Sequence, residues 1–177
     1  MQPLGTLAPE FALPNAVTGA IVTRDQARGT HGLLVMFLCV HCPFVKHIEQ
    51  QIARFPADYA GNGLGIAAIS SNDAVAHPAD APAGMKEQAD RLGFRFPYLY
   101  DESQQVARAY EAACTPDFFL YDAALKLVYR GQFDASRPGM DTPVTGEDLR
   151  RAVEALLAGK PPLAEQRPSL GCNIKWK

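Results

Sequence analysis

A continuous apolar run from Leu33 to Leu38 is followed closely by a helix-starting signal at Pro43. Such a run suits a strand buried on both faces of a sheet that helices cover. Proline is tolerated at the first helical position, where its missing N–H costs no hydrogen bond. Four apolar side chains follow at helical spacing: Phe44, Ile48, Ile52 and Phe55. The sequence therefore predicts a central strand leading into an amphipathic helix, with polar residues such as Glu49 directed away from the core.

Further strands and helices alternate along the chain. Strands are predicted at 64–70, 96–100, 118–121 and 125–129, with the last two pairing antiparallel. Helices are predicted near 84–92 and at 102–110, and a further helix starts within 145–148 and is stopped by Gly159. Near the start, the segments 7–14 and 21–23, joined by a turn at Thr18-Gly19, predict an edge hairpin. The pattern indicates a three-layer α/β sandwich in one domain over residues 1–159. Residues 160–177 form a Pro-rich tail that packs on this domain or extends from it.

Composition excludes several classes of protein. The chain has 177 residues, 47% of them hydrophobic, which is enough for one substantial core. Its net charge of −2 and scattered basic residues offer no face for nucleic acid. Neither a secretory signal nor a long apolar span is visible, so we expect a cytoplasmic protein that does not enter a membrane. Four cysteines in a reducing compartment favour catalytic, redox-sensing or metal chemistry over structural disulfides.

Cys42 stands between the predicted central strand and the helix that Pro43 begins. Unpaired backbone N–H groups and the helix dipole favour a thiolate there, so its pKa is expected below the ordinary value of about 8.5. Lys46 and His41 are possible modulators, through charge and through a hydrogen bond or proton. The alternative is that Cys42 is simply a buried small apolar residue.

Cys39 and Cys42 have C-x-x-C spacing, which by itself indicates a redox pair or half of a zinc site. No second C-x-x-C follows, and we expect neither a metal nor an organic cofactor. The rival hypothesis is a copper(I) or zinc module that uses both thiolates with His41 or His47. A redox-inert scaffold is the third possibility. His31, His47 and His77 are expected at the surface, and Arg130 and Asp134 in structural roles.

Three segments carry a resemblance to a known family. They are Leu7–Leu13, Met36–Phe44 and Cys114–Asp122, and the ending from Gly171 to Lys177 adds to them. They resemble the AhpC/TSA (redoxin) family, and within it the peroxiredoxin-like branch of thioredoxin-fold proteins. The resemblance implies a thioredoxin-like α/β/α sandwich with a mixed sheet.

The resemblance also implies roles for individual residues. Cys42 falls on the attacking cysteine of thioredoxin, and Thr115-Pro116 on the cis-proline loop that lies against it. Cys39 takes the place of the peroxiredoxin threonine, and Thr115 that of the catalytic arginine. Those two missing residues stabilise the oxygen leaving a peroxide, whereas disulfide exchange needs neither.

The predicted function is thiol-disulfide exchange or antioxidant chemistry, an oxidoreductase reaction in which Cys42 attacks a disulfide or peroxide. A second thiol, Cys39 or Cys114, releases the intermediate, and Cys172 in the tail is a further candidate. Thr115 and Pro116 are expected to offer backbone contacts to an extended substrate. The expected partners are that substrate and a thioredoxin- or glutathione-type reductant, and the chain is expected to be a monomer or homodimer.

Overall fold

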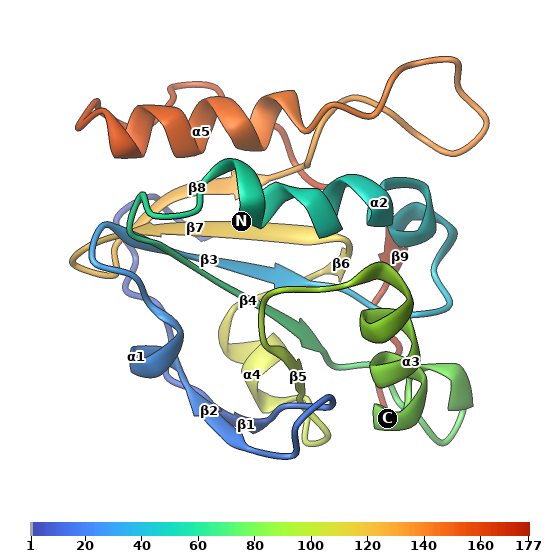
Figure 1. The fold of residues 1–177 in the computed structure, drawn as a ribbon. Helices are drawn as coiled ribbons and strands as arrows, with labels where there is room; N and C mark the ends of the chain where they lie inside the picture. Colours follow the sequence, from blue (N-terminus) through green and yellow to red (C-terminus); the bar gives the residue numbers. More distant parts are fainter. Residues whose placement is uncertain (1) are drawn as a thin grey trace.

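The centre of the protein is a five-stranded mixed sheet in the order β5-β4-β3-β7-β8, seen in the computed structural model, which describes residues 2–177 (Figure 1). β3 (Gly32–Phe37), β4 (Leu64–Ser70) and β5 (Tyr98–Tyr100) run parallel. β7 (Asp117–Asp122) pairs antiparallel with β3, and β8 (Leu127–Gly131) antiparallel with β7. Every residue of β3 is buried, which confirms the predicted central strand.

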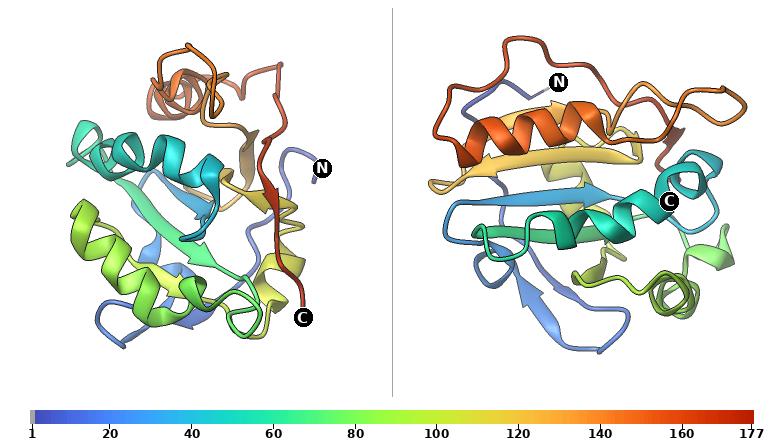
Figure 2. Two further views of the ribbon diagram at one scale, coloured as in Figure 1. Left: turned by 90° about the vertical axis from the view of Figure 1, so that its right-hand side faces the viewer. Right: turned by 45° about the horizontal axis from the view of Figure 1, so that its top comes forward.

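Helices and a hairpin cover the two faces of this sheet (Figures 1 and 2). One face packs against α2 (Pro43–Asp58), α3 (Pro82–Leu92) and α5 (Glu147–Leu157). The other packs against α4 (Gln105–Ala109) and the hairpin of β1 (Ala12–Pro14) and β2 (Ile21–Thr23). The alternation of β3 explains this division, because Leu34 and Met36 join the first core and Leu33, Val35 and Phe37 the second. Within residues 2–177, no helix is both long and apolar enough to span a membrane.

The buried side of α2 differs from the prediction at three positions. Val45 is buried and Phe44 only partly so. Glu49, expected to face solvent, is buried because α3 packs beside it: Gln88 Nε2 donates to its carboxylate at 3.2 Å and Arg91 Nη1 at 3.1 Å. A buried carboxylate is tolerated only with such partners. The sequence of α2 alone could not reveal them.

Several predicted boundaries were too wide, and local turns explain two of them. The helix predicted at 102–110 begins only at Gln105, because Asp101 accepts from the Ser71 and Ser103 hydroxyls and from the Ala107 N–H, closing a turn. The strand predicted from 125 begins at Leu127, since Leu125 has a φ of 60°. The strand predicted from 96 begins at Tyr98. Two short helices, α1 (Arg24–Ala27) and the 3₁₀ turn η1 (Pro78–Asp80), lay outside the predictions.

The tail from 160 to 177 turns back along the domain. Its strand β9 (Cys172–Asn173) pairs antiparallel with β6 (Cys114–Thr115), with Thr115 opposite Cys172 and Cys114 opposite Asn173. Figure 2 (left) shows this red segment descending across the side of the molecule where α2 begins. The sequence did not predict this two-stranded sheet.

Candidate active site

Cys42 is the N-cap residue of α2, with Pro43 at the first helical position. Its extended backbone, φ −68° and ψ 125°, ends the loop that follows β3. The sulfur is fully buried and lies 3.3 Å from the backbone oxygen of Thr115. Cys42 therefore lies at a helix start, as predicted, but its side chain is not exposed to solvent.

The loop of Thr115 and Pro116 forms the wall opposite α2. The Thr115–Pro116 peptide bond is cis. Thr115 Oγ1 lies 3.2 Å from Cys39 Sγ, and Cys114 Sγ lies 3.7 Å from the Pro116 carbonyl oxygen. Thr115 thus contacts the sulfurs of both Cys39 and Cys42, whereas the Cys114 sulfur contacts Pro116 within the loop itself.

The surroundings lower the pKa of Cys42 to about 4. The largest cause is the hydrogen bond from the Cys39 thiol; the Cys172 thiol, the Val45 N–H and the Cys172 N–H also donate, while burial opposes them. The same hydrogen bond to Cys42, followed by burial, raises the pKa of Cys39 far above its usual range. Within the pair, the hydrogen bond from Cys39 therefore favours the thiolate form of Cys42 and the thiol form of Cys39.

The other two cysteines are protonated thiols near neutral pH. Burial raises the pKa of Cys114 to about 12. Cys172 has a pKa raised to about 11 by burial and by its hydrogen bond to Cys42. All four cysteines are free thiols, and Cys172 is the one that is partly exposed. The fold thus brings the four predicted cysteines into one site.

The two predicted modulators do not supply the leading effects on Cys42. Lys46 is exposed, and the main donors are thiols and backbone N–H groups instead. His41 turns to a buried carboxylate, with its Nδ1 2.5 Å from Asp80 Oδ2. His77, expected at the surface without partners, stacks on His41 with ring centroids 4.9 Å apart.

Asp80 is the site residue that the sequence analysis missed. Its carboxylate is fully buried and accepts from the backbone N–H groups of Val40 and His41, at 2.8 and 3.1 Å. It also accepts from Asn72 Nδ2 at 2.8 Å. These bonds fix the loop that ends at Cys42. No local motif marks Asp80, because η1 approaches this loop only in the folded chain.

Cys39, His41 and Asp80 could hold a metal ion, since their ligand atoms lie within 4.8 Å of one another. This set differs from the predicted one, in which Cys42 was a ligand. Asp80 is already engaged by four hydrogen bonds, which fit a structural role as well as a ligand role.

The remaining predicted residues lie elsewhere: His47 Nε2 is 3.1 Å from Ser136 Oγ, and Arg130 Nη2 donates to Glu111 O. Asp134 accepts from Thr145 and Gly146 at the start of α5.

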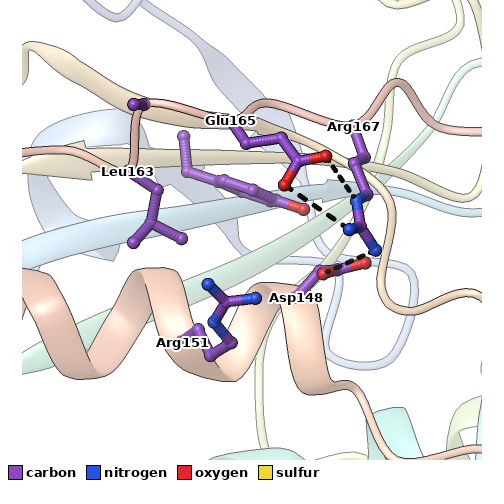
Figure 3. Close-up of a pocket in the computed structure, with 7 residues that line it drawn as sticks. Asp148, Arg151, Leu163, Glu165 and Arg167 are labelled. Atoms are coloured by element: carbon purple, nitrogen blue, oxygen red, sulfur yellow. Dashed lines mark hydrogen bonds and ion pairs between the residues drawn. The ribbon is translucent and has the colours of Figure 1, made fainter.

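One cavity, of about 250 Å³, lies away from the thiols (Figure 3). It is lined by α5, by Tyr129 of β8 and by the tail, and Arg167 forms one ion pair with Glu165 of the same tail segment and one with Asp148 of α5. No cysteine or histidine lines it, so it is not part of the thiol site.

The geometry agrees with comparisons to known proteins. A model of the AhpC/TSA family matches residues 4–130. The chain belongs to the AhpC/TSA family. The match includes β3, α2 and the Thr115–Pro116 loop, but ends before β9, so the family assignment does not cover Cys172.

Two solved structures resemble this AhpC/TSA member over its whole length. An uncharacterized conserved protein from Geobacillus kaustophilus is 52% identical with a TM-score of 0.97, over 100% of this chain and 94% of that one. A hypothetical protein from Sinorhizobium meliloti 1021 is 50% identical with a TM-score of 0.97, covering 100% and 96%. No curated protein matches.

More distant structures share the fold. A putative thiol:disulfide interchange protein DsbE from Chlorobium tepidum has a TM-score of 0.67 at 20% identity, over 89% of this chain and 99% of that one. At this identity the likeness concerns the thioredoxin-like fold alone.

Proposed function

We propose that this protein is a thiol-disulfide oxidoreductase in which the Cys42 thiolate attacks a substrate disulfide. The observation that carries the proposal is the convergence of thiol and backbone donors on Cys42 at the N-terminus of α2. Such donors keep the sulfur anionic near neutral pH, and the thiolate is the nucleophile in disulfide exchange. A thioredoxin- or glutathione-type reductant in the cytoplasm would restore the thiols.

Disulfide exchange is favoured over peroxide reduction by the groups around Cys42. The oxygen leaving a peroxide needs hydrogen-bond donors or positive charge. The resemblance implies that Cys39 takes the place of the peroxiredoxin threonine and Thr115 that of the arginine. In the structure these two side chains lie 3.2 Å apart, and Arg130 donates to Glu111 O. Exchange with a disulfide needs only a thiolate, a second thiol and access.

The test is the reaction of the reduced protein with glutathione disulfide, followed by mass spectrometry and by release of glutathione. Wild type is expected to release glutathione at neutral pH, and Cys42→Ser to lose this reaction while remaining folded by circular dichroism. Hydrogen peroxide is tested in parallel, and we expect it to be consumed far more slowly. Equal rates for wild type and Cys42→Ser with both oxidants would refute the proposal.

The cluster of Cys39, His41 and Asp80 keeps metal binding as a second candidate. Metal analysis after anaerobic purification separates the two. Stoichiometric zinc or copper that is lost in both Cys39→Ser and Asp80→Asn would support the metal module. Metal-free protein that retains disulfide exchange would support the oxidoreductase.

A further inference from the structure

The edge of β6 that the sequence analysis assigned to a substrate is occupied by the protein's own β9. Thr115 pairs with Cys172, so the backbone expected to receive an extended substrate is already in a strand pair. The approach is close at Gly171, where an added Cβ would lie 2.2 Å from the Thr115 oxygen. Because only glycine fits at position 171, the close pairing of β9 with β6 depends on this residue.

The register of β9 brings Cys172 to the catalytic sulfur. Thr115 is opposite Cys172 in the strand pair, and its carbonyl oxygen is the group 3.3 Å from Cys42 Sγ. The strand pairing therefore sets Cys172 beside Cys42, and the Cys172 thiol and N–H are among the groups that lower the pKa of Cys42. The segment is held in this place from both sides. Ser169 Oγ donates to Gly131 O at 2.6 Å before it, and the side chain of Ile174 is buried after it.

We propose that Cys172 is the second redox thiol of this site and forms a disulfide with Cys42, so that β9 acts as a resident substrate strand. The proposal rests on the proposed function. It also explains why Cys42 is buried. β9 lies over its sulfur, and an external disulfide reaches this sulfur when the short β6–β9 pair opens.

Cys172 suits this role better than the other two thiols. Cys39 is fully buried at the end of β3 and bonded to Thr115 Oγ1, where it serves as a donor to Cys42. Cys114 is buried and its sulfur lies by the Pro116 carbonyl. Cys172 is partly exposed, so it can lose its proton to solvent and can later be attacked by a reductant. It also lies on a two-residue strand, which can move more readily than the central sheet.

The chemistry balances with a disulfide RSSR as the oxidant. The Cys42 thiolate attacks one sulfur, the S–S bond breaks, and one RS⁻ leaves with a solvent proton as RSH. Cys172 then gives its proton to solvent and attacks Cys42 Sγ of the mixed disulfide, expelling the second RS⁻. The two cysteines are oxidised by two electrons and RSSR is reduced to two RSH. An external dithiol that attacks Cys172 reverses the oxidation.

Peptide mapping identifies the disulfide. Trypsin cleaves after Arg28 and Lys46, so Cys39 and Cys42 share one peptide, while Cys114 and Cys172 lie on two others. Reduced protein is treated with glutathione disulfide, alkylated and digested without reduction. We expect the peptide of residues 29–46 linked to the Cys172 peptide in wild type and in Cys39→Ser. In Cys172→Ser we expect Cys42 to retain glutathione.

A disulfide between Cys39 and Cys42, or one to Cys114, with Cys172 alkylated, would overturn the inference and leave the proposed function standing. If no variant forms an adduct or a disulfide at Cys42, the proposed function fails and this inference fails with it. The two failures are therefore distinguishable.

A second variant tests the strand pair itself. Gly171→Val places a branched side chain against the Thr115 carbonyl and should displace β9. Overpacking of this kind lowers the equilibrium constant for strand pairing by about ten- to a hundredfold. We therefore expect the Cys42–Cys172 disulfide to form about tenfold more slowly. The glutathione adduct at Cys42 should form at least as fast as in wild type. The control is Leu170→Val, an exposed neighbour, and equal disulfide rates in the two variants would refute the strand's role.

Discussion

The four thiols differ in protonation because each has a different neighbour. Cys42 accepts hydrogen bonds from Cys39, from β9 and from the start of α2, whereas Cys39 donates its hydrogen bond to Cys42 and lies beside the Asp80 carboxylate. A hydrogen bond given to a thiolate lowers the pKa of the acceptor and raises that of the donor. Reactivity at this site is thus set residue by residue.

The pKa of Cys42 is measurable from its thiolate ultraviolet absorbance. We expect the difference in absorbance between reduced wild type and Cys42→Ser to titrate at about pH 4. The thiolate is present above that pH and is lost as the pH falls through it. Cys39→Ala removes the main donor and should move the inflection to higher pH. An inflection at or above about 8.5 in wild type would contradict the assignment.

Asp80 is expected to stabilise the loop before Cys42. Asp80→Asn replaces one acceptor oxygen by an NH₂ group, which then faces the donors of Asn72 or His41. An unsatisfied buried group of this kind should lower the free energy of unfolding by about 2–4 kcal/mol in urea titrations. The matched control is Asp90→Asn, whose exposed ion pair with Lys86 should be worth less than about 1 kcal/mol. Equal effects would show that the Asp80 bonds are not specific.

At the scale of elements, the start of α5 shows how a helix is fixed in place without a side-chain cap of its own. Gly146 is the N-cap with a φ of 70°, and Asp134 from the preceding loop accepts its N–H. Phe133 packs directly over Gly146, where an added Cβ would lie 2.5 Å from the ring. The helix therefore depends on a glycine for backbone conformation and for space.

Two glycine variants separate these requirements. Gly159→Ala, at a φ of +67° with open space around it, should cost about 1–2 kcal/mol of unfolding free energy from strain alone. Gly146→Ala adds the clash with Phe133 and should cost about 1–3 kcal/mol more. Urea unfolding of the two variants gives the difference. Equal values would mean that the ring moves aside without cost.

At the scale of the whole molecule, the end of the tail packs against the rest of the chain. Ile174 is buried in the core on the α4 side of the sheet. Gln104 Nε2 donates to Lys175 O at 2.8 Å, and Arg108 lies over the Trp176 ring at 4.3 Å. These contacts hold the chain beyond β9 and thereby fix where Cys172 stands.

Ile174→Ala tests this attachment. Removal of a buried isoleucine side chain should lower the unfolding free energy by about 2–5 kcal/mol. Leu170→Ala, at an exposed position of the same tail, should change it by less than about 0.5 kcal/mol. Both are measured by urea denaturation with the protein kept reduced. A small effect in both variants would show that the tail docks without joining the core.

Local patterns in the sequence determined much of the scaffold. The run at 33–38 predicted β3, and Pro43 placed the start of α2, with Cys42 at its N-cap. Such features depend on residues a few positions apart, so periodicity and proline chemistry suffice to find them. The four cysteines were also recognised as the place to look for function.

Only the tertiary structure decided what surrounds Cys42. Asp80 and Cys172 reach the site from η1 and β9, elements of three and two residues that are too short to leave a periodic pattern. The position of Cys172 follows from burial of Ile174 and from strand pairing with β6, and that of Asp80 from hydrogen bonds with Val40 and Asn72. A sequence pattern indicates which face of a helix or strand is apolar. Which other element packs against that face is decided only by the tertiary structure.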